Sequence, residues 1–393
     1  MRWKRVTLGE ISLNIQTGPF GSQLHQSDYS EKGTPVVMPK DMVNGHISEA
    51  SIARVSEEHI IRLNRHKIEV GDILYSRRGD VGRCAFATEL EQGWLCGTGC
   101  LRVTIDKSKA IPKYVFYQLQ KAETVGWVEK HAIGATMLNL NTSILSSIPI
   151  DMPSLAEQQT IVDALSAYDD LIENNQKQIK LLEEAAQRLY KEWFVGLRFP
   201  GHETTLITDG IPEGWKRERL VDIVQVQYGY AFDGSLFNAK GNGTPIVRIR
   251  NIPNGTTADY TTEDADPQYI VHNGDLLVGM DGEFYVNSWS GPDAYLVQRT
   301  CSFRPNYPNM KGYLLQAIYE PIKYFENTVV GATVAHLGKK HIDTITVPTA
   351  PDELYIPFQQ HFDRRQLLLN QNRLLAEARD RLLQKLMNGE IEV

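Results

Sequence analysis

The chain is built from two unequal copies of one segment, and this duplication limits the folds open to it. Five motifs of the first copy return in the same order in the second: WKR at positions 3 and 215, GTPVV at 33 and GTPIV at 243, GDIL at 71 and GDLL at 274, GATMLNL at 134 and GATVAHL at 331, and KLLEEAAQRL at 180 and RLLAEARDRL at 373. The offset falls from 212 to 193 along the chain, and Cys100 is matched with Cys301. Because chance similarity would not keep this order, we predict a duplicated unit with pseudo-twofold character rather than a solenoid.

Each copy has two parts that differ in their residue patterns. Residues 1–150 and 213–350 contain short β-branched runs separated by Gly, Pro and Thr, a pattern typical of strands joined by turns. Residues 154–194 and 357–388 carry helical periodicity. A chain of 393 residues also exceeds the usual size of one hydrophobic core. We therefore predict an α+β fold in which two duplicated globular α/β segments are separated by two long, antiparallel, coiled-coil-like helices.

The first long helix has clear boundaries and a heptad pattern. Ser154 and Glu157 form a capping box, and Gly196 follows the last apolar turn. The second helix is less regular, with Pro357 where the first copy has its capping box. The predicted seam residues are Leu165, Ile172, Asn175, Ile179, Leu182 and Leu189 in the first helix, and Leu368, Asn372, Leu375 and Leu382 in the second.

A second apolar row makes the stripe on each helix wider than a two-stranded seam needs. Its members are Leu171, Leu181 and Ala185 in the first helix, and Leu367, Leu374, Ala378 and Leu383 in the second. The alternative is an amphipathic helix packed on its own domain. Length favours a pair, because a helix from 155 to 194 is ~60 Å long. We infer an antiparallel pair that also offers a face to partner helices.

Composition excludes several classes of protein. The apolar stretches are shorter than the ~18 residues of a membrane span, so we expect no membrane contact and a cytoplasmic location. Cys96 and Cys100 form a C-x3-C pair without nearby histidines, and we interpret them as buried apolar residues; no metal site is predicted. The net charge of −7 hides a division, since residues 1–150 hold 18 Lys plus Arg against 15 Asp plus Glu, and residues 213–350 hold 12 against 15. The first globular segment is therefore the better suited to phosphates.

Sequence patterns of catalysis and cofactor binding are missing. The chain has no P-loop, no G-x-G-x-x-G, no H-E-x-x-H and no G-x-S-x-G motif. The tetrapeptide at Asp266–Tyr269 resembles the D-P-P-Y motif of amino-methyltransferases, but no glycine-rich cofactor loop precedes it. We therefore expect no catalytic residues and no cofactor on this chain.

Polar side chains follow the predicted strands at matching places of the two copies. SRRGDVGR carries three arginines just after the strand ILY, and LNLNTS and AHLGKK fill a second matching loop. Arg reads guanine, and Asn or Gln read adenine, by paired hydrogen bonds. Met280 and Asp281 replace Arg77 and Arg78, and suit a methyl group, a cytosine amine or no DNA contact. The candidate DNA-contacting residues are Lys40, Arg77, Arg78, Arg83, Asn139, Asn141, Thr142, Arg248, Arg250, Asn251, Asp281, His336, Lys339 and Lys340; the alternative for each is a solvent-exposed turn residue.

These features together resemble the specificity subunit of type I restriction-modification enzymes. The motifs that carry the resemblance are SRRGDVG after GDIL, the GAT loop before IPIDMPSLAEQQ, QRLYKEWF before RFPG, the P-x-G-W that opens the second copy, and the terminal LMNGEIEV. The second copy departs from the pattern with YIPFQQ at its helix start. The resemblance covers nearly the whole chain.

The resemblance implies a division of labour along the chain. Residues 1–152 and 213–350 would be target recognition domains, 153–196 and 351–393 conserved spacer helices, and 197–212 a linker. Each domain would recognise one part of a split, asymmetric sequence in double-stranded DNA. The helices would dock two adenine methyltransferase subunits, with restriction subunits joining later. S-adenosylmethionine, ATP and Mg²⁺ would be bound by those partners, and this chain would be a non-catalytic subunit.

Two other functions remain open from the sequence. A self-contained DNA methyltransferase would require a cofactor loop, and binding of S-adenosylmethionine by the purified chain would reveal one. A coiled-coil scaffold whose globular segments bind protein would leave sequence-specific methylation unchanged when Arg77 and Arg78 are substituted.

Overall fold

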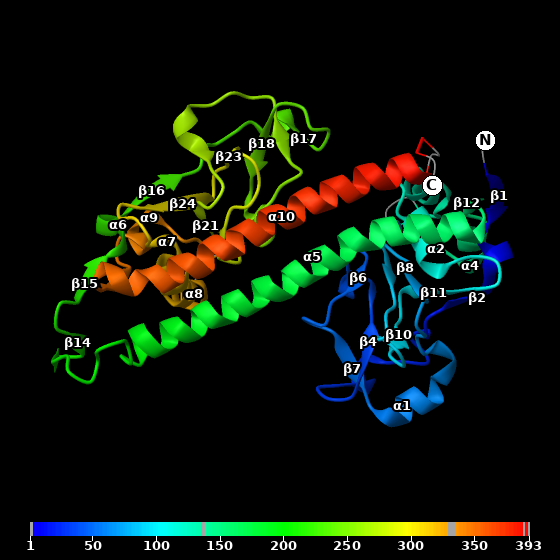
Figure 1. The fold of residues 1–393 in the computed structure, drawn as a ribbon, viewed down its shortest axis with the longest axis horizontal. Coiled ribbons are helices and arrows are strands. Elements are labelled where there is room, and N and C mark those ends of the chain that lie inside the picture. The colour runs from blue at the N-terminus through cyan, green and yellow to red at the C-terminus, as the bar shows by residue number, and fades with distance from the viewer. Residues whose placement is uncertain (1–2, 135–137, 329–334, 388–389, 392–393) are drawn as a thin grey trace. The chain divides into compact units, whose positions relative to one another are not determined.

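The computed structural model describes residues 3–134, 138–328, 335–387 and 390–391. Parts of the two GAT motifs, at 135–137 and 331–334, and of the terminal LMNGEIEV motif lie outside these residues. The chain forms two compact units, Met1–Asp169 with Glu377–Val393, and Asp170–Ala376 (Figure 1). Each long helix therefore contributes one part to each unit.

The first unit is built on two four-stranded sheets. One has the order β2-β11-β8-β9, with strands Ser12–Thr17, Cys100–Ile105, Ile73–Ser76 and Cys84–Phe86. The other has the order β10-β4-β7-β3, with strands Leu95–Cys96, Thr34–Val37, Ala53–Val55 and Tyr29–Ser30. Two-stranded pairs are formed by β1 (Lys4–Thr7) with β12 (Pro149–Met152), and by β5 (Met42–Val43) with β6 (His46–Ile47). The α-helices before the first long helix are α1 (Glu57–Arg62), α2 (Pro112–Leu119), α3 (Ala122–His131) and α4 (Thr142–Ser146).

The second unit repeats this plan. Its four-stranded sheet has the order β16-β24-β21-β22, with strands Val224–Tyr228, Thr300–Pro305, Leu276–Gly279 and Val286–Ser288. Its five-stranded sheet has the order β17-β19-β18-β23-β20, with strands Phe237–Asn238, Tyr260–Thr261, Thr244–Val247, Ala294–Leu296 and Ile270–Val271. The pair β15 (Lys216–Arg219) with β25 (Thr346–Thr349) matches β1 with β12, and a hairpin of β13 (Ile207–Thr208) and β14 (Ile211–Pro212) precedes it. Its short helices are α6 (Leu220–Ile223), α7 (Lys311–Ala317), α8 (Tyr319–Thr328) and α9 (Lys339–Ile342).

The backbone pairing corrects one detail of the sequence comparison. Gly18 donates its N–H to the carbonyl of Cys100 at 2.9 Å, and Gly229 donates to Thr300 at 3.0 Å. Cys100 and Thr300 also both begin the second strand of their sheets. The match of Cys100 with Cys301 is therefore wrong by one residue, because an alignment of identical side chains ignores hydrogen-bond register.

The first long helix, α5 (Leu155–Tyr190), starts as its sequence predicts. The backbone N–H of Ser154 donates to the Glu157 carboxylate at 2.9 Å, and the N–H of Glu157 donates back to the Ser154 hydroxyl at 3.3 Å. A π-helical turn, Lys191–Val195, closes the helix before Gly196. These reciprocal bonds satisfy donors that the first turn of a helix otherwise leaves unpaired.

The second long helix, α10 (Ile356–Met387), begins one residue before Pro357. Proline is tolerated in the first helical turn because its missing N–H would have no partner there. Within the second unit Asn175 bonds to Asn372, while Glu183, further along α5, pairs with Arg365, earlier in α10. The residue numbers run in opposite directions, so the helices are antiparallel.

The helices are part of the hydrophobic core of each unit. In the first unit Ile161 and Leu165 pack with Leu383 and Leu386 in the same cluster as the β2-β11-β8-β9 sheet. In the second unit Phe194 and Phe358 share a cluster with the β16-β24-β21-β22 sheet. In each unit, the apolar face of this four-stranded sheet is therefore covered by the long helices.

A buried ion pair adds specificity to the helix contact in the first unit. The Asp169 carboxylate accepts hydrogen bonds from the Tyr117 hydroxyl at 2.5 Å and from Arg379 at 2.8 Å. Burial acts to raise the pKa of Asp169, but the bonds from Tyr117 and Arg379 outweigh it and hold that pKa below its ordinary value. The Asp169 carboxylate on α5 thus joins Tyr117 of α2 to Arg379 of α10.

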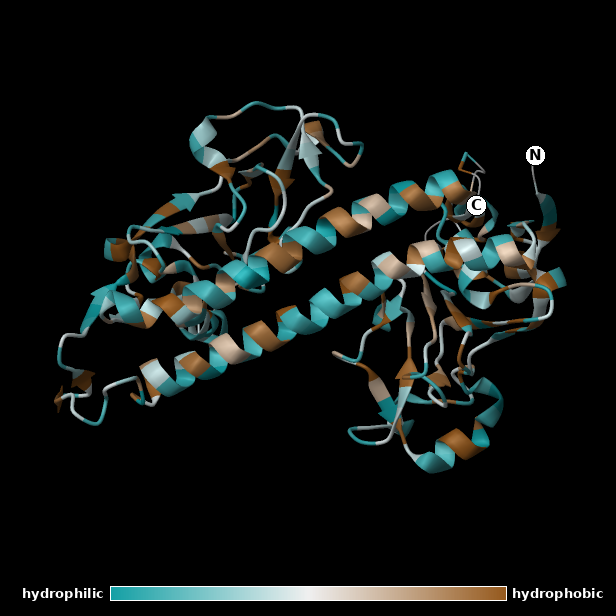
Figure 2. Cartoon of the chain, in the orientation of Figure 1, coloured by the Kyte–Doolittle hydropathy of each residue, from teal (hydrophilic) through white to brown (hydrophobic). Residues whose placement is uncertain are grey.

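The hydropathy of the long helices alternates along their length, with hydrophobic and hydrophilic bands side by side (Figure 2). Among the described residues, no helix is long and apolar enough to cross a membrane. This mixed surface is that of helices packed on one face and solvated on the other.

Candidate nucleic-acid interface

In the first unit, the arginine loop after β8 is joined to the asparagine loop before α4. Leu140 donates its N–H to the carbonyl of Arg77 at 2.8 Å, and Gly79 donates to Leu138 at 3.0 Å. Between these bonds, Arg78 and Asn139 face each other in an isolated antiparallel bridge. These two segments lie about sixty residues apart in the sequence, and both were predicted to contact DNA. In the structure they form one surface.

Arg77 also contacts a residue that sequence reasoning missed. Its guanidinium carbon lies 5.6 Å from the ring centre of Phe20, whose side chain is half exposed. The Nε atom of Arg77 and Oδ1 of Asn139 are buried without a hydrogen-bond partner among the described residues. Phe20 stands in the glycine-rich stretch TGPFGS, which is the signal that could have drawn attention to it. An exposed aromatic ring beside an arginine is a surface suited to stacking with bases.

The second unit builds the same joint from different residues. Leu337 donates its N–H to the carbonyl of Met280 at 2.7 Å, and Gly282 donates to Ala335 at 3.0 Å. Asp281 and His336 form the bridge that Arg78 and Asn139 form in the first unit. Met280 is buried in the core, so of the pair that replaces Arg77 and Arg78 only Asp281 reaches the surface.

Asp281 is held by two basic side chains. Its Oδ1 atom lies 2.5 Å from Nδ1 of His336, and its Oδ2 atom lies 3.4 Å from Nη1 of Arg299. Arg299 was not predicted from the sequence, because it stands at the end of a strand-connecting turn far along the chain from both partners. We refer to Arg299, Asp281 and His336 as the Arg299 cluster.

Several other candidates are already paired within the protein. Arg250 forms two hydrogen bonds with Asp259, at 3.1 and 2.5 Å, and Lys339 contacts both carboxylate oxygens of Asp343. Arg83 pairs with Asp80 at 2.8 Å, and Lys40 donates to the carbonyl of Ser51 at 2.9 Å. To meet DNA, these cations would have to exchange a partner, which reduces what each contact contributes.

Two asparagines among the candidates serve the local backbone. Asn141 caps α4 by accepting from the N–H of Ile144 at 2.8 Å, and Thr142 is the first residue of that helix. Asn251 accepts from the N–H of Arg248 at 2.8 Å and donates to Asp259 at 3.2 Å. Such short polar residues at turns are selected by backbone geometry as readily as by a ligand.

Five basic candidates form no ion pair in the described part of the chain; they are Lys40, Arg77, Arg78, Arg248 and Lys340. Lys340 is exposed on α9, beside the His336 loop. The guanidinium of Arg248 lies 5.5 Å from the ring centre of Phe237. With Arg78, these are the candidates whose charge is least neutralised by the protein itself.

The predicted seam residues divide between the two units. Leu165 lies in the core of the first unit, and Leu382 packs against it. In the second unit Asn175, Ile179 and Leu368 are buried, and Leu189 packs against the core. The other four seam residues, partly exposed in the same unit, are Ile172, Leu182, Asn372 and Leu375. Of the second apolar row, Leu383 is buried, whereas Leu171, Leu181, Leu367 and Leu374 are 51, 63, 47 and 55% exposed.

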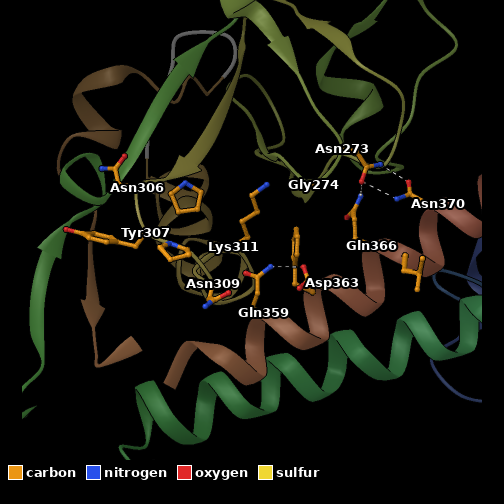
Figure 3. Close-up of a pocket in the computed structure, with 14 residues that line it drawn as sticks. Asn273, Gly274, Asn306, Tyr307, Asn309, Lys311, Gln359, Asp363, Gln366 and Asn370 are labelled. Atoms are coloured by element: carbon orange, nitrogen blue, oxygen red, sulfur yellow. Dashed lines mark hydrogen bonds between the residues drawn. The ribbon is translucent and has the colours of Figure 1, made fainter. Parts of the chain in front are cut away.

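A groove of about 670 Å³ runs between α10 and the turn before β21 (Figure 3). Asn273 accepts from Gln366 and Asn370, each at 3.1 Å, and donates to Asn370 at 2.7 Å. Because these amides satisfy one another, they tie the β21 turn to α10. These contacts thus help to position β21, and Met280 and Asp281 follow directly after its last residue, Gly279.

The features set aside in the sequence have structural explanations. Asp266 accepts from the N–H of Gln268 at 2.9 Å and caps a 3-10 turn at Pro267–Tyr269. Cys84, Cys96, Cys100 and Cys301 are all buried free thiols. Within the described residues, no group of three or more His, Cys, Asp or Glu side chains could hold a metal ion.

Comparison with known proteins decides the family. The model of the type I restriction modification DNA specificity domain matches residues 2–184 and 212–377. The chain belongs to this family. It is a specificity subunit of a type I restriction-modification enzyme, the non-catalytic member of that complex.

Curated relatives match this specificity subunit over most of their length. It is 26% identical to the MjaIX specificity subunit of Methanocaldococcus jannaschii, over 91% of this chain and 87% of that protein. It is 22% identical to the HindI specificity subunit of Haemophilus influenzae, over 99% of both chains. The fold is similar to the crystal structure of a type I S subunit from M. genitalium, with a TM-score of 0.55, 16% identity and coverage of 98% of this chain and 96% of that one.

Proposed function

We propose that this specificity subunit recognises a bipartite, asymmetric sequence in double-stranded DNA with one globular domain for each half. Residues 1–152 and 213–350 are the recognition domains, 153–196 and 351–393 the spacer helices, and 197–212 the linker. The observation that carries the proposal is a joint between two loops that recurs in both domains. Arg78 and Asn139 occupy the positions in the first domain that Asp281 and His336 occupy in the second.

The chemistry of these positions supports recognition of unlike sequences. Arg and Asn present donors to guanine and adenine, whereas Asp accepts from the amine of cytosine. The backbone hydrogen bonds that place them are the same in both copies, within 0.1 Å for the bond from Leu140 to Arg77 at 2.8 Å and from Leu337 to Met280 at 2.7 Å. A shared scaffold with exchanged side chains is what two half-sites of different sequence require.

The helices supply the second part of the proposal, docking of two adenine methyltransferase subunits. Four leucines of α5 and α10 in the second unit are 47 to 63% exposed. Large exposed apolar side chains on a helix surface are typical of protein interfaces. S-adenosylmethionine would be bound by the methyltransferase subunits, and ATP and Mg²⁺ by the restriction subunits that join the complex.

A domain exchange tests the recognition part. Residues 213–350 are replaced by the matching segment of a specificity subunit whose target is known, and methylated adenines are mapped in DNA from cells that also express the methyltransferase. We expect one half of the target to change and the other to stay as in the wild type. A change in both halves, or in neither, would contradict the proposal.

Introducing negative charges at exposed leucines of the helices tests docking. Leu171→Glu with Leu374→Glu should reduce recovery of the methyltransferase with this subunit at least tenfold, because two carboxylates enter an apolar interface. The matched control is Gln176→Glu with Gln371→Glu, which adds the same charges at exposed polar positions of the same helices. Equal recovery with both double variants would exclude this surface.

A further inference from the structure

In each domain, the loop after one strand of the four-stranded sheet, β8 or β21, is joined to the turn that precedes the neighbouring strand, β11 or β24. In the first domain the N–H of Arg77 donates to the carbonyl of Gly99 at 2.8 Å. In the second the N–H of Met280 donates to the carbonyl of Arg299 at 2.9 Å. Gly99 and Arg299 are therefore equivalent, each lying directly before the first residue of its strand, Cys100 or Thr300.

Arg299 occupies a backbone conformation that favours glycine. Its φ is +70°, close to the +89° of Gly99. Non-glycine residues in this left-handed region are uncommon, because Cβ crowds the carbonyl oxygen. Burial does not offset the strain, since the Arg299 side chain is 55% exposed. The position is thus unfavourable for an arginine in the isolated chain, and a ligand is the simplest source of compensation.

The two domains place their arginines on opposite sides of the same joint. In the first, Arg77 and Arg78 come from the loop after β8, and the adjoining turn carries Gly99. In the second, the loop after β21 has lost both arginines and the adjoining turn has gained Arg299. A backbone hydrogen bond connects the loop and the turn in both domains. Both domains therefore have an arginine at this joint, supplied by the loop in the first domain and by the turn in the second.

Asp281 positions the Arg299 guanidinium and leaves part of it available. Nη1 of Arg299 lies 3.4 Å from Oδ2 of Asp281 and 3.4 Å from Nδ1 of His336, while Oδ1 of Asp281 is 2.5 Å from Nδ1 of His336. Nη2 and Nε of Arg299 have no protein partner among the described residues. An arginine that is oriented by a carboxylate and keeps two free donors fits the O6 and N7 acceptors of guanine.

We propose that Arg299, positioned by Asp281, contacts a guanine in the half of the target recognised by residues 213–350. This rests on the proposed function, and it makes Arg299 a specificity-determining residue. The Arg299 cluster also explains how an aspartate can stand at a DNA surface, because the Arg299 guanidinium offsets its repulsion of phosphates. A surface ion pair of structural value alone would contribute little and would have no effect on base preference.

The test compares three variants in the complex assembled with methyltransferase subunits. Arg299→Gly restores the residue of the first domain and suits the positive φ, so the protein should fold with a Tm no lower than the wild type. Arg299→Lys keeps the charge without the paired donors. Arg219→Ala is the control, since Arg219 is an exposed arginine of the same domain that pairs with Asp222 at 2.7 Å.

The readouts are the map of methylated adenines and the Kd for targets with each base pair replaced in turn. Arg299→Gly should lower discrimination roughly 5- to 100-fold at one G·C pair of the second half-site and leave the first half-site unchanged. Arg299→Lys should not restore it, and Arg219→Ala should behave as the wild type.

Three outcomes would overturn the inference. These are an unchanged preference with Arg299→Gly, an equal loss of affinity for every target, and full discrimination with Arg299→Lys, which would indicate a phosphate contact. Failure of the proposed function looks different. In that case the wild-type complex has no bipartite target, or the target does not follow an exchange of residues 213–350.

Discussion

The side-chain amide of Asn175 donates a hydrogen bond of 2.9 Å to Oδ1 of Asn372, across the two long helices. Asn372 in turn donates to the backbone carbonyl of Ile172 at 3.3 Å. Asn175 is only 8% exposed, so its amide has little access to water. A polar pair of this kind inside an apolar seam is satisfied in one register, and a shift of either helix would bury it unpaired.

A double-mutant cycle at this pair should show strong coupling. Asn175→Leu or Asn372→Leu alone leaves one amide unpaired and should lower the free energy of unfolding by about 1–3 kcal/mol. The double variant removes both amides and should be close to wild-type stability. Urea denaturation of the four proteins measures the coupling; additive losses would show that the amides do not depend on each other.

Arg365 should be the main fastening between the second recognition domain and the helices. It is 9% exposed and bonds to Glu183 at 2.6 Å, Ser288 at 2.7 Å and Asn287 at 2.9 Å. Arg365→Met keeps the apolar stem but leaves those acceptors unpaired, so we expect a loss of about 2–3 kcal/mol in unfolding free energy. The neighbouring Arg364→Met, which removes a single bond to Gln178 at 3.2 Å, is the control and should cost less than about 1 kcal/mol. Equal losses for both would contradict this assignment.

His66 should make the first domain sensitive to acid. Burial, with the nearby charge of Arg65, lowers the pKa of His66 to about 4. The unfolded chain binds a proton at this residue near pH 6.5, so stability from neutral His66 is fully present above that pH and is lost as pH falls toward 4. The loss would be up to about 3 kcal/mol. When unfolding is followed between pH 7 and 4, the free energy of unfolding should depend less on pH for His66→Gln than for the wild type. The same pH dependence in both proteins would contradict the prediction.

The thiols should be unreactive until the protein unfolds. Burial raises the pKa of Cys84 to about 12, and it also raises those of Cys100 and Cys301. Since only the thiolate reacts, a disulfide reagent at pH 8 should label the folded chain slowly and the urea-unfolded chain at all four cysteines. Rapid labelling of Cys84 in the folded chain would show that its environment is more open than the structure has it.

Local patterns in the sequence were sufficient to predict much of the fold. The capping box at Ser154 and Glu157 predicts the start of α5, because both partners lie within one helical turn. The repeated motifs predict two copies of one fold, and the 3.5-residue spacing predicts a helix pair with Asn175 in its seam. The paired loops around Arg78 and Asn139 also emerged from the repeat, since matching motifs fold alike.

Other relationships depend on register and distance in three dimensions. Phe20 and Arg77 approach each other from the segments that follow two different strands, and Asn372 was predicted for the seam without its bond to Asn175. Matching Cys100 with Cys301 placed the two copies one residue out of step and hid the equivalence of Gly99 and Arg299. Sequence similarity compares side chains, whereas strand register is set by backbone hydrogen bonds.

The residue pattern is sufficient to predict two copies of one α+β fold, two long helices, and polar loops that differ at matching places of the two copies. Which side chains meet at those places depends on the folded backbone. Asp281, Arg299 and His336 come from three separate segments, and their approach requires both the pairing of β21 with β24 and a positive φ at Arg299. Neither leaves a local pattern in the sequence, because both arise from contacts between residues that are distant along the chain.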